Sequence, residues 1–152
     1  MRAVLQRVKY SNLTVENQPT AEIKSGIVAL IGIKSGDNEE VFAKIIDKIT
    51  NLRIFEDDNG KMNLSVKDIK GGILAVPNFT LYSDCRHGRR PDFAKGAPPA
   101  EAKAAFEAFT SRLKAAYPDT QTGVFGADMQ VELLNDGPIT IVLDSDELMP
   151  NR

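Results

Sequence analysis

Cysteine, histidine and tryptophan are almost absent from this sequence, which has one Cys, one His and no Trp among 152 residues. The lone cysteine, Cys85, rules out a disulfide within the chain and suits a reducing compartment, so we expect a cytoplasmic protein. Cys85 and the single histidine, His87, cannot supply the three or four nitrogen and sulfur ligands that zinc usually takes. A metal site made only of carboxylates stays open but has no support in the sequence, and we expect no metal.

Long apolar runs and an excess of one charge are missing as well. No run approaches the roughly 20 apolar residues that span a bilayer, and the first ten residues lack the apolar core of a signal peptide. Basic side chains number 19 and acidic side chains 21, which gives a net charge of −2. This balance excludes a protein that coats nucleic acid through bulk charge. We expect no membrane partner, and only local contacts with any nucleic acid.

The rest of the composition is that of an ordinary globular chain, with 42% hydrophobic and 26% charged residues. Folding a chain of this length buries about 70% of the surface that the unfolded chain exposes, so no disulfide framework is needed for stability. No repeat or long linker interrupts the sequence. We predict one domain over residues 1–145 and a short, loose C-terminal tail over 146–152.

Hydrophobic spacing predicts two main helices. Asp37 followed by Glu40 has the spacing of a capping box, and apolar residues at helical intervals extend this segment to about Asn51. A second helix begins at Pro98-Pro99. Its core face is expected to consist of Ala102, Phe106, Phe109, Leu113 and Tyr117.

The remaining apolar segments read as strands. The nearly continuous run Ile27–Ile33 predicts a central strand that is buried on both faces. The other predicted strands are Arg2–Val8, Asn12–Val15, Thr20–Lys24, Leu52–Phe55, Met62–Val66, Ile73–Val76, Met129–Leu134 and Ile139–Leu143. Residues 135–138 form a strong turn signal, which predicts that the last two strands make a hairpin. The pattern favours an α+β fold, a single domain of antiparallel or mixed, barrel-like sheet layers with two main helices.

Two candidate sites lie close together and each has an ordinary structural alternative. Cys85 and His87 stand two residues apart, and this spacing does not by itself bring a nucleophile and a base together. An exposed loop is the simpler interpretation. The same stretch holds the main concentration of positive charge, which is either a solvated face or a phosphate-binding loop. The basic residues are Arg86, Arg89, Arg90 and Lys95.

Two further segments leave an alternative open. Thr80 follows a predicted strand and Pro77, so it is either a strand threonine, the commoner case, or a residue whose hydroxyl or amide faces a pocket. Gly137-Pro138 is either part of an ordinary hairpin turn or a special backbone site. Because only roughly 5–6% of X-Pro bonds in folded proteins are cis, the residues alone favour the ordinary turn.

Several segments, taken together, resemble the D-aminoacyl-tRNA deacylases of the bacterial and eukaryotic type. The resemblance covers nearly the whole chain, and the segments follow one another in the order and spacing of that family. They are residues 1–8 (MRAVLQRV), 51–57 (NLRIFED), 60–65 (GKMNLS), 79–81 (FTL), 88–91 (GRRP), 125–131 (FGADMQV) and 135–140 (NDGPIT).

The resemblance implies an enzyme that hydrolyses the ester joining a D-amino acid, or glycine, to the terminal ribose of tRNA. It also implies a homodimer with its active sites at the subunit interface and without a metal or organic cofactor. Gly137 and Pro138 match a cis dipeptide that one subunit inserts into the pocket of the other, where its main-chain carbonyls hold the substrate amino group. An L side chain would collide with this motif. Arg7 matches an arginine that orients it.

For catalysis, the resemblance places Phe79 and Thr80 beside the ester, with main-chain N–H groups that stabilise the oxyanion. No base is visible to activate the Thr80 hydroxyl. We therefore favour attack by water, with the assistance from the 2′-hydroxyl of the terminal ribose that the resemblance implies. The family usually has Ser-Gln where this chain has Pro77-Asn78. Asn78 keeps the amide on a shorter side chain, whereas Pro77 has neither a hydroxyl nor an N–H.

The basic residues Arg86, Arg89, Arg90 and Lys95 then gain a partner in the acceptor-stem phosphates, an assignment that rests on charge. We predict a cytoplasmic, homodimeric member of this family that acts on aminoacylated tRNA and has no DNA partner. The alternative is a non-catalytic tRNA- or protein-binding module on the same fold, inactivated by the change at Pro77-Asn78.

Overall fold

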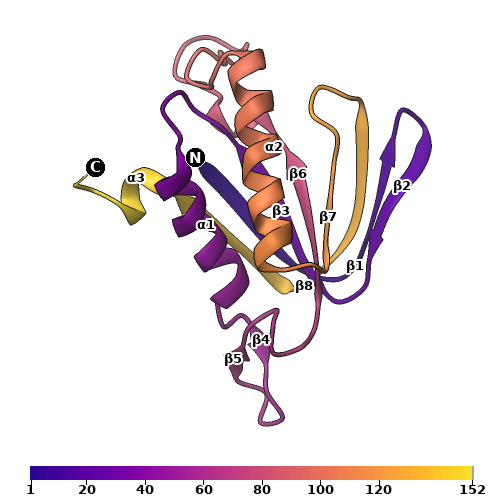
Figure 1. Ribbon diagram of the computed structural model, residues 1–152. Coiled ribbons are helices and arrows are strands. Elements are labelled where there is room, and N and C mark those ends of the chain that lie inside the picture. Colours follow the sequence, from indigo (N-terminus) through magenta and orange to yellow (C-terminus); the bar gives the residue numbers. More distant parts are fainter. Residues whose placement is uncertain (152) are drawn as a thin grey trace.

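A curved mixed sheet forms the centre of the computed structural model, which describes residues 1–151. The strands are β1 (Arg2–Val15), β2 (Gln18–Ile23), β3 (Gly26–Gly32), β4 (Phe55–Glu56), β5 (Met62–Leu64), β6 (Gly72–Pro77), β7 (Thr120–Thr122) and β8 (Met129–Asp144). The helical elements are α1 (Glu39–Asn51), the 3₁₀ turn η1 (Phe79–Tyr82), α2 (Pro99–Ala116) and α3 (Ser145–Leu148). Figure 1 shows α1 and α2 lying side by side across the sheet.

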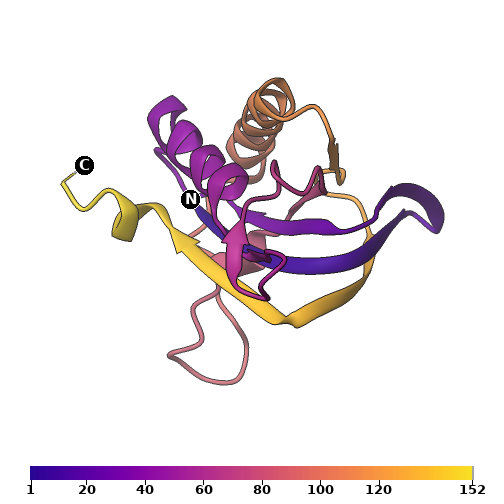
Figure 2. The same cartoon turned by 90° about the horizontal axis from the view of Figure 1, so that it is seen from below.

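The long strand β1 organises the sheet. Strand order is β2–β1–β3–β6–β7, and β8 runs along β1. The pairs that involve β1 are antiparallel, whereas β3, β6 and β7 are parallel to one another. Seen from below, β8 lies on the side of the sheet away from α1 and α2, and the hairpin of β1 and β2 extends sideways beyond the helices (Figure 2). The predicted α+β, barrel-like mixed sheet is therefore confirmed, as is the central position of β3.

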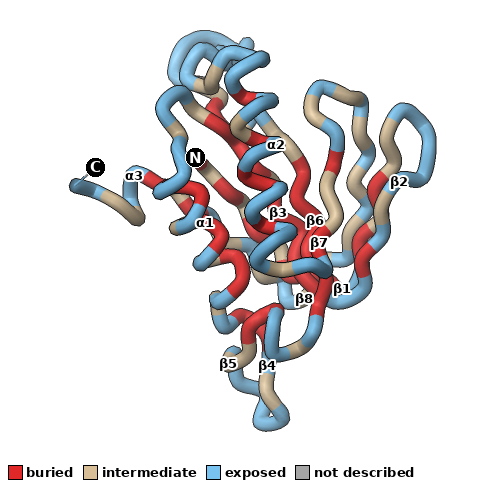
Figure 3. Tube along the Cα trace, in the orientation of Figure 1, coloured by how far each residue is buried: buried red, intermediate tan, exposed pale blue. Residues whose placement is uncertain are grey.

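Two hydrophobic cores lie on opposite faces of the sheet. Successive side chains of a strand point to opposite faces, and β3 therefore supplies Ile27, Ala29 and Ile31 to the helix-side core and Val28 to the other. Figure 3 shows the buried residues running through the middle of the strands and along the inner sides of α1 and α2. At Gly26, an added Cβ would lie 1.9 Å from a backbone oxygen of β6, so only glycine permits this strand contact.

The two predicted main helices are present, and only the N-cap of α1 differs from the prediction. The N-cap of α1 is Asn38, whose Oδ1 accepts from the backbone N–H groups of Glu40 (3.1 Å) and Val41 (3.3 Å). The predicted cap, Asp37, instead accepts from the buried amino group of Met1 at 2.6 Å. In α2 the four predicted core residues within the helix are buried, and Tyr117 is the C-cap. No helix of residues 1–151 is long and apolar enough to cross a membrane.

The C-terminal third departs most from the prediction. The segments on either side of residues 135–138 do not pair with each other, so the predicted hairpin is wrong. Both segments belong to β8 and pair with β1, one after the other. Two short elements were not predicted, the polar strand β7 and the helix α3. The predicted tail from residue 146 thus begins inside α3, whose N-cap Asp144 accepts from the backbone N–H of Asp146.

Candidate functional site

A loop bulges out of β8 where β1 carries Arg7. Gln6 pairs with Thr140 and Val8 pairs with Asn135, so the whole segment 136–139 lies opposite the single residue between them on β1. Such a large bulge aims the backbone away from the sheet. The Gly137-Pro138 peptide bond within it is cis, and both residues are exposed. The ordinary hairpin turn is therefore the wrong interpretation of this segment, because both flanking segments pair with β1.

Hydrogen bonds from the Arg7 side chain fix the start of this loop. Its side chain is buried, and its Nε donates to the backbone oxygen of Asp136 at 2.9 Å while Nη1 donates to the backbone oxygen of Ile54 at 2.8 Å. The Asp136 carboxylate lies 3.5 Å from Nε. A buried guanidinium stays charged, so it requires these acceptors. The arginine thereby fixes the start of the bulge to the segment that precedes β4.

Asn135 closes the loop at its base. Its side chain accepts from the backbone N–H of Ile139 at 2.8 Å and donates to Oγ1 of Thr140 at 2.9 Å. Gly137 has φ +136°, and an added Cβ would lie 2.7 Å from Cγ1 of Ile139. Because L side chains rarely adopt this φ and no space exists for one, glycine is required here. The loop thus presents Gly137-Pro138 on a braced support.

A second group of predicted site residues lies where β6 ends. The backbone N–H of Asn78 donates to the carbonyl of Ile31 at 2.8 Å, and the chain then turns into η1. Pro77 cannot donate to the sheet ladder, which helps to end the strand. Thr80 therefore lies in an exposed 3₁₀ turn, and its interpretation as a strand threonine is wrong. The first N–H groups of such a turn have no acceptor within it, so those of Phe79 and Thr80 stay available.

The hydroxyl of Thr80 is already engaged, because it donates to Oδ1 of Asn78. An amide oxygen is not a base that activates a hydroxyl. Across the described chain, no group of three or more His, Cys, Asp or Glu side chains is placed to hold a metal ion. What this turn offers a substrate is its backbone N–H groups.

A cavity of about 490 Å³ adjoins the turn, within the roughly 300–1,000 Å³ range of small-molecule sites. Its walls combine apolar and polar surface and include part of the segment 125–131. The lining residues are Gln6, Leu30, Val76, Pro77, Asn78, Ala127, Asp128, Met129, Val131 and Leu133. Neither Gly137 nor Pro138 lines this cavity. Sequence reasoning had not singled out the contribution of Gln6 and Leu30, because strands distant in sequence place them here.

The predicted site residues thus form two groups. One group is the bulge with Arg7, and the other is Asn78, Phe79 and Thr80 beside the cavity. Within residues 1–151, no hydrogen bond or ion pair joins the two groups. One copy of the chain therefore does not bring Gly137-Pro138 to the cavity.

The basic loop is the segment that carries Arg86, Arg89, Arg90 and Lys95. Backbone hydrogen bonds between two acidic residues close this loop at its base. Asp84 and Asp92 exchange backbone hydrogen bonds of 2.7 and 2.9 Å. The Asp84 carboxylate also binds Arg86 (2.5 Å) and Lys95 (3.1 Å). The Arg86 guanidinium, then its backbone N–H and Lys95, hold the pKa of Asp84 well below its usual range. Two of the four predicted phosphate ligands are thus already paired.

The loop tip is different. Arg89 and Arg90 are exposed and form no ion pair with any other residue that the structure describes. Cys85 is exposed in the same loop and makes no hydrogen bond with His87, which agrees with the loop interpretation. In Figure 2 the segment between β6 and α2 projects on the side of the sheet opposite to the helices.

Tyr82 anchors the end of η1. Its side chain is buried, and the guanidinium of Arg2 lies 4.8 Å from the ring centroid. Its hydroxyl has no hydrogen-bond partner among the described residues. Burial, followed by the charges of Asp37 and Asp144, raises the pKa of Tyr82 well above its usual value. The side chain is therefore a neutral packing residue.

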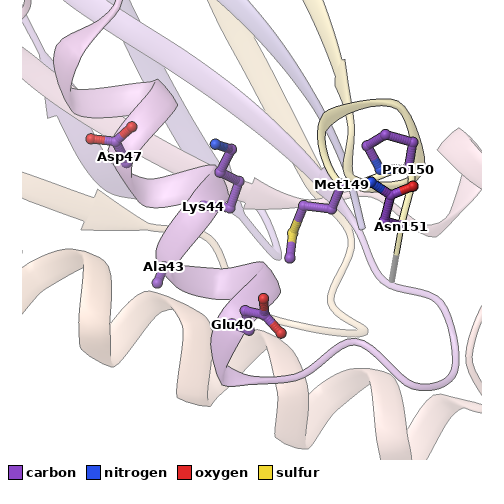
Figure 4. Close-up of a pocket in the computed structure, with 7 residues that line it drawn as sticks. All are labelled: Glu40, Ala43, Lys44, Asp47, Met149, Pro150 and Asn151. Carbon is purple, nitrogen blue, oxygen red and sulfur yellow. The ribbon is translucent and has the colours of Figure 1, made fainter.

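A larger cavity lies elsewhere. It has a volume of about 710 Å³ and opens between α1 and the C-terminal residues. Its lining residues are Glu40, Ala43, Lys44, Asp47, Met149, Pro150 and Asn151 (Figure 4). It contains none of the predicted site residues, and the charged side chains of α1 that border it are of both signs. Its size alone does not make it the functional site.

Comparisons with known proteins find relatives that match this chain over almost its whole length. A family model described as D-Tyr-tRNA(Tyr) deacylase matches residues 4–144. A D-aminoacyl-tRNA deacylase from Thermosipho africanus is 50% identical over 145 residues, which cover 95% of this chain and 97% of that protein. One from Geobacillus sp. is 48% identical over the full length of both chains.

Solved structures are similar over almost the whole chain. One described as c-Myc DNA Unwinding Element Binding Protein has a TM-score of 0.89 and 39% sequence identity, and the match covers 95% of this chain and 98% of that one. A probable eukaryotic D-amino acid tRNA deacylase has a TM-score of 0.79 at 18% identity, with 94% and 98% covered. At that identity the second likeness concerns the fold alone.

Proposed function

Because this chain belongs to the D-Tyr-tRNA(Tyr) deacylase family, we propose a division of labour between its two groups of site residues. The chain is a D-aminoacyl-tRNA deacylase, a hydrolase that cleaves the ester of D-aminoacyl-tRNA to free D-amino acid and tRNA. The observation that carries the proposal is that the family match spans both the bulge with Arg7 and the turn at Phe79 and Thr80. The reaction removes amino acids of the wrong hand before translation uses them.

The turn and its cavity form the hydrolytic half of the site. The cavity takes the terminal nucleoside, and the N–H groups of Phe79 and Thr80 face the ester carbonyl. Water adds to the carbonyl carbon, and the negative charge on its oxygen is stabilised by these N–H groups. The bond to the ribose oxygen then breaks, and that oxygen takes up a proton. The ribose 2′-hydroxyl assists the water, because the Thr80 hydroxyl donates to Asn78 and no base lies beside it.

The bulge forms the selective half, supplied by a second copy of the chain. Gly137 and Pro138 enter the partner's cavity, where their backbone carbonyls hold the amino group of the substrate. An L side chain then meets the loop, whereas the hydrogen of a D-amino acid or of glycine fits. Selectivity of this kind needs no contact with the side chain. D-amino acids of different size and glycine are therefore all accepted.

Two features support a homodimer. The two groups of site residues do not meet within one copy, although the bulge is exposed and braced. In addition, β8 is an edge strand with exposed apolar side chains, including Val142, which is 65% exposed, and Leu134, which is 47% exposed. Exposed apolar side chains next to a functional loop are typical of an interface.

The basic loop contacts the phosphates of the tRNA. Arg89 and Arg90 carry this role because they are unpaired within the described chain, whereas Arg86 and Lys95 share Asp84. The loop projects from the same end of β6 as the turn. A tRNA substrate and a lone cysteine both fit an enzyme of the cytoplasm.

The proposal is tested by deacylation of matched D-tyrosyl- and L-tyrosyl-tRNA by the purified protein. We expect rapid loss of the D ester and a rate for the L ester close to that in buffer. Binding of both charged tRNAs without hydrolysis of either would contradict the proposal and favour a binding module on this fold. Equal hydrolysis of the two esters would remove the selective role of the bulge.

A further inference from the structure

Two exposed aromatic rings stand beside the turn. Phe79 is 58% exposed and Phe93 is 40% exposed, and their ring centroids lie 5.1 Å apart with planes at 71°. This edge-to-face arrangement leaves ring faces open to solvent. Large aromatic rings normally gain free energy by burial, so an exposed pair indicates a surface that meets a partner.

The backbone holds Phe93 in place. It follows Asp92, which is paired with Asp84 and whose carboxylate accepts from the backbone N–H of Ala94 at 2.6 Å. The Phe93 carbonyl accepts from the N–H of Gly96 at 3.1 Å. The ring is therefore presented from a structured turn, on the same loop as the two unpaired arginines.

The charged residues near the two rings indicate that the partner is a nucleic acid strand. Arg89 and Arg90 form no ion pair among residues 1–151 of a chain with net charge −2, and they lie on the loop that carries Phe93. Phe79 directly precedes Thr80 in η1. A surface that combines aromatic rings with cations binds single-stranded nucleic acid through stacking and phosphate contacts.

We infer that Phe79 and Phe93 form a stacking surface for an unpaired base of the tRNA 3′ strand, adjacent to the terminal adenosine. This inference rests on the proposed function, which puts the terminal nucleoside in the neighbouring cavity. Arg89 and Arg90 bind the phosphates of the strand as it leaves the site. Stacking tolerates any base, so the surface serves tRNAs of different body sequence.

The test compares two substrates, D-tyrosyl-tRNA and the D-tyrosyl ester of adenosine, which lacks the preceding nucleotides. Loss of one stacking contact is worth about 1–3 kcal/mol, roughly tenfold or more in affinity. We expect Phe93→Ala to lower kcat/KM about tenfold on the tRNA and less than about twofold on the nucleoside ester. Phe93→Tyr should retain the activity on tRNA. Tyr10→Ala is the control, because Tyr10 is an aromatic residue of similar exposure, 38%, on another part of the chain.

Salt dependence gives a second readout. Arg89→Gln and Arg90→Gln should each reduce the slope of log affinity against log salt by about 0.7, the value for one phosphate of a single strand. Equal losses on both substrates for Phe93→Ala would assign the ring a packing role and overturn the inference, as would no loss on either. Either of these two outcomes for Phe93→Ala leaves the proposed function intact, provided that the wild-type protein cleaves both the nucleoside ester and the tRNA. Protein that cleaves neither contradicts the proposed function itself.

Discussion

Replacing Arg7 by alanine should weaken both the fold and the selective loop. The substitution removes the donors to the carbonyls of Ile54 and Asp136, which lie 2.8 and 2.9 Å from the guanidinium. Hydrogen bonds to a charged group contribute about 1.5–3 kcal/mol each, and the site is buried. The Asp136 carboxylate is 36% exposed and regains water, which limits the loss. We therefore expect a destabilisation of about 2–4 kcal/mol.

Thermal unfolding and deacylation together measure this effect. For a chain of about 150 residues, 1 kcal/mol corresponds to about 2–4 °C in Tm, so Arg7→Ala should lower the Tm by roughly 5–15 °C. At a temperature where the variant is folded, hydrolysis of D-tyrosyl-tRNA should fall at least about tenfold because Gly137-Pro138 is no longer braced. Arg7→Lys keeps the charge but cannot bridge both carbonyls, and should be intermediate.

Lys9 provides a matched control on the same strand. Its Nζ lies 3.9 Å from the Asp136 carboxylate and its side chain is 63% exposed. Exposed ion pairs contribute about 0–1 kcal/mol, so Lys9→Ala should leave the Tm and the activity nearly unchanged. An Arg7→Ala protein with the Tm and D-ester activity of the wild type would refute the role of Arg7 as the brace of the loop.

Two further predictions concern the turn. Thr80→Val removes the hydroxyl but keeps the backbone N–H, so kcat/KM for D-tyrosyl-tRNA should fall by less than about fivefold; a loss of several hundredfold would identify the hydroxyl as the nucleophile. Tyr82→Phe removes a buried hydroxyl without a partner in the described chain, so unfolding at pH 7 should show unchanged or greater stability, by up to about 1 kcal/mol. Because the folded-state pKa of Tyr82 is raised, this hydroxyl leaves the free energy of unfolding independent of pH below about pH 10 and lowers it as the pH rises further. The wild type should therefore lose more stability than Tyr82→Phe between pH 9 and 11, and parallel losses in urea titrations would contradict this.

The spacing of apolar residues correctly predicted the strand and the helix whose hydrophobic patterns are the clearest. The apolar run at Ile27–Ile33 and the core face of α2 appear as expected, because alternation and helical periodicity follow directly from backbone geometry. The predicted N-cap of α1 was wrong by one residue. Asp37 and Asn38 are equally good caps, and the choice depends on the Met1 amino group, a partner distant in sequence.

The bulge in β8 could not be predicted from its own residues. Asn-Asp-Gly-Pro is a turn signal in any hairpin, and only the long partner strand β1 keeps both flanking segments in one line. The burial of Arg7 could not be predicted from its neighbours in the sequence either. Its sequence neighbourhood suits a surface charge on a strand, whereas the structure buries it between two carbonyls of other segments. Its assigned role came from the family resemblance and not from the local pattern.

The basic loop shows how a single acidic residue changes the interpretation of a charge cluster. All four cations looked equivalent in the sequence, but Asp84 binds Arg86 and Lys95 and leaves Arg89 and Arg90. The prediction for Thr80 as a strand residue was wrong for another reason. Strand propensity outweighed the signal of Pro77, a residue that cannot continue the ladder of hydrogen bonds.

The central claim is that one copy supplies the cavity and another supplies the loop, and mixing two inactive variants tests it most directly. Gly137→Val disables the loop, because an added Cβ would lie 2.7 Å from Ile139, and Ala127→Trp fills the cavity. Each variant alone should be inactive on D-tyrosyl-tRNA. After the two are unfolded together and refolded, half of the dimers are mixed and carry one intact site, so about a quarter of the wild-type activity should return, with the L ester still spared. No recovery, in a mixture shown to contain mixed dimers, would place the cavity and the loop of each site in the same chain and contradict the account.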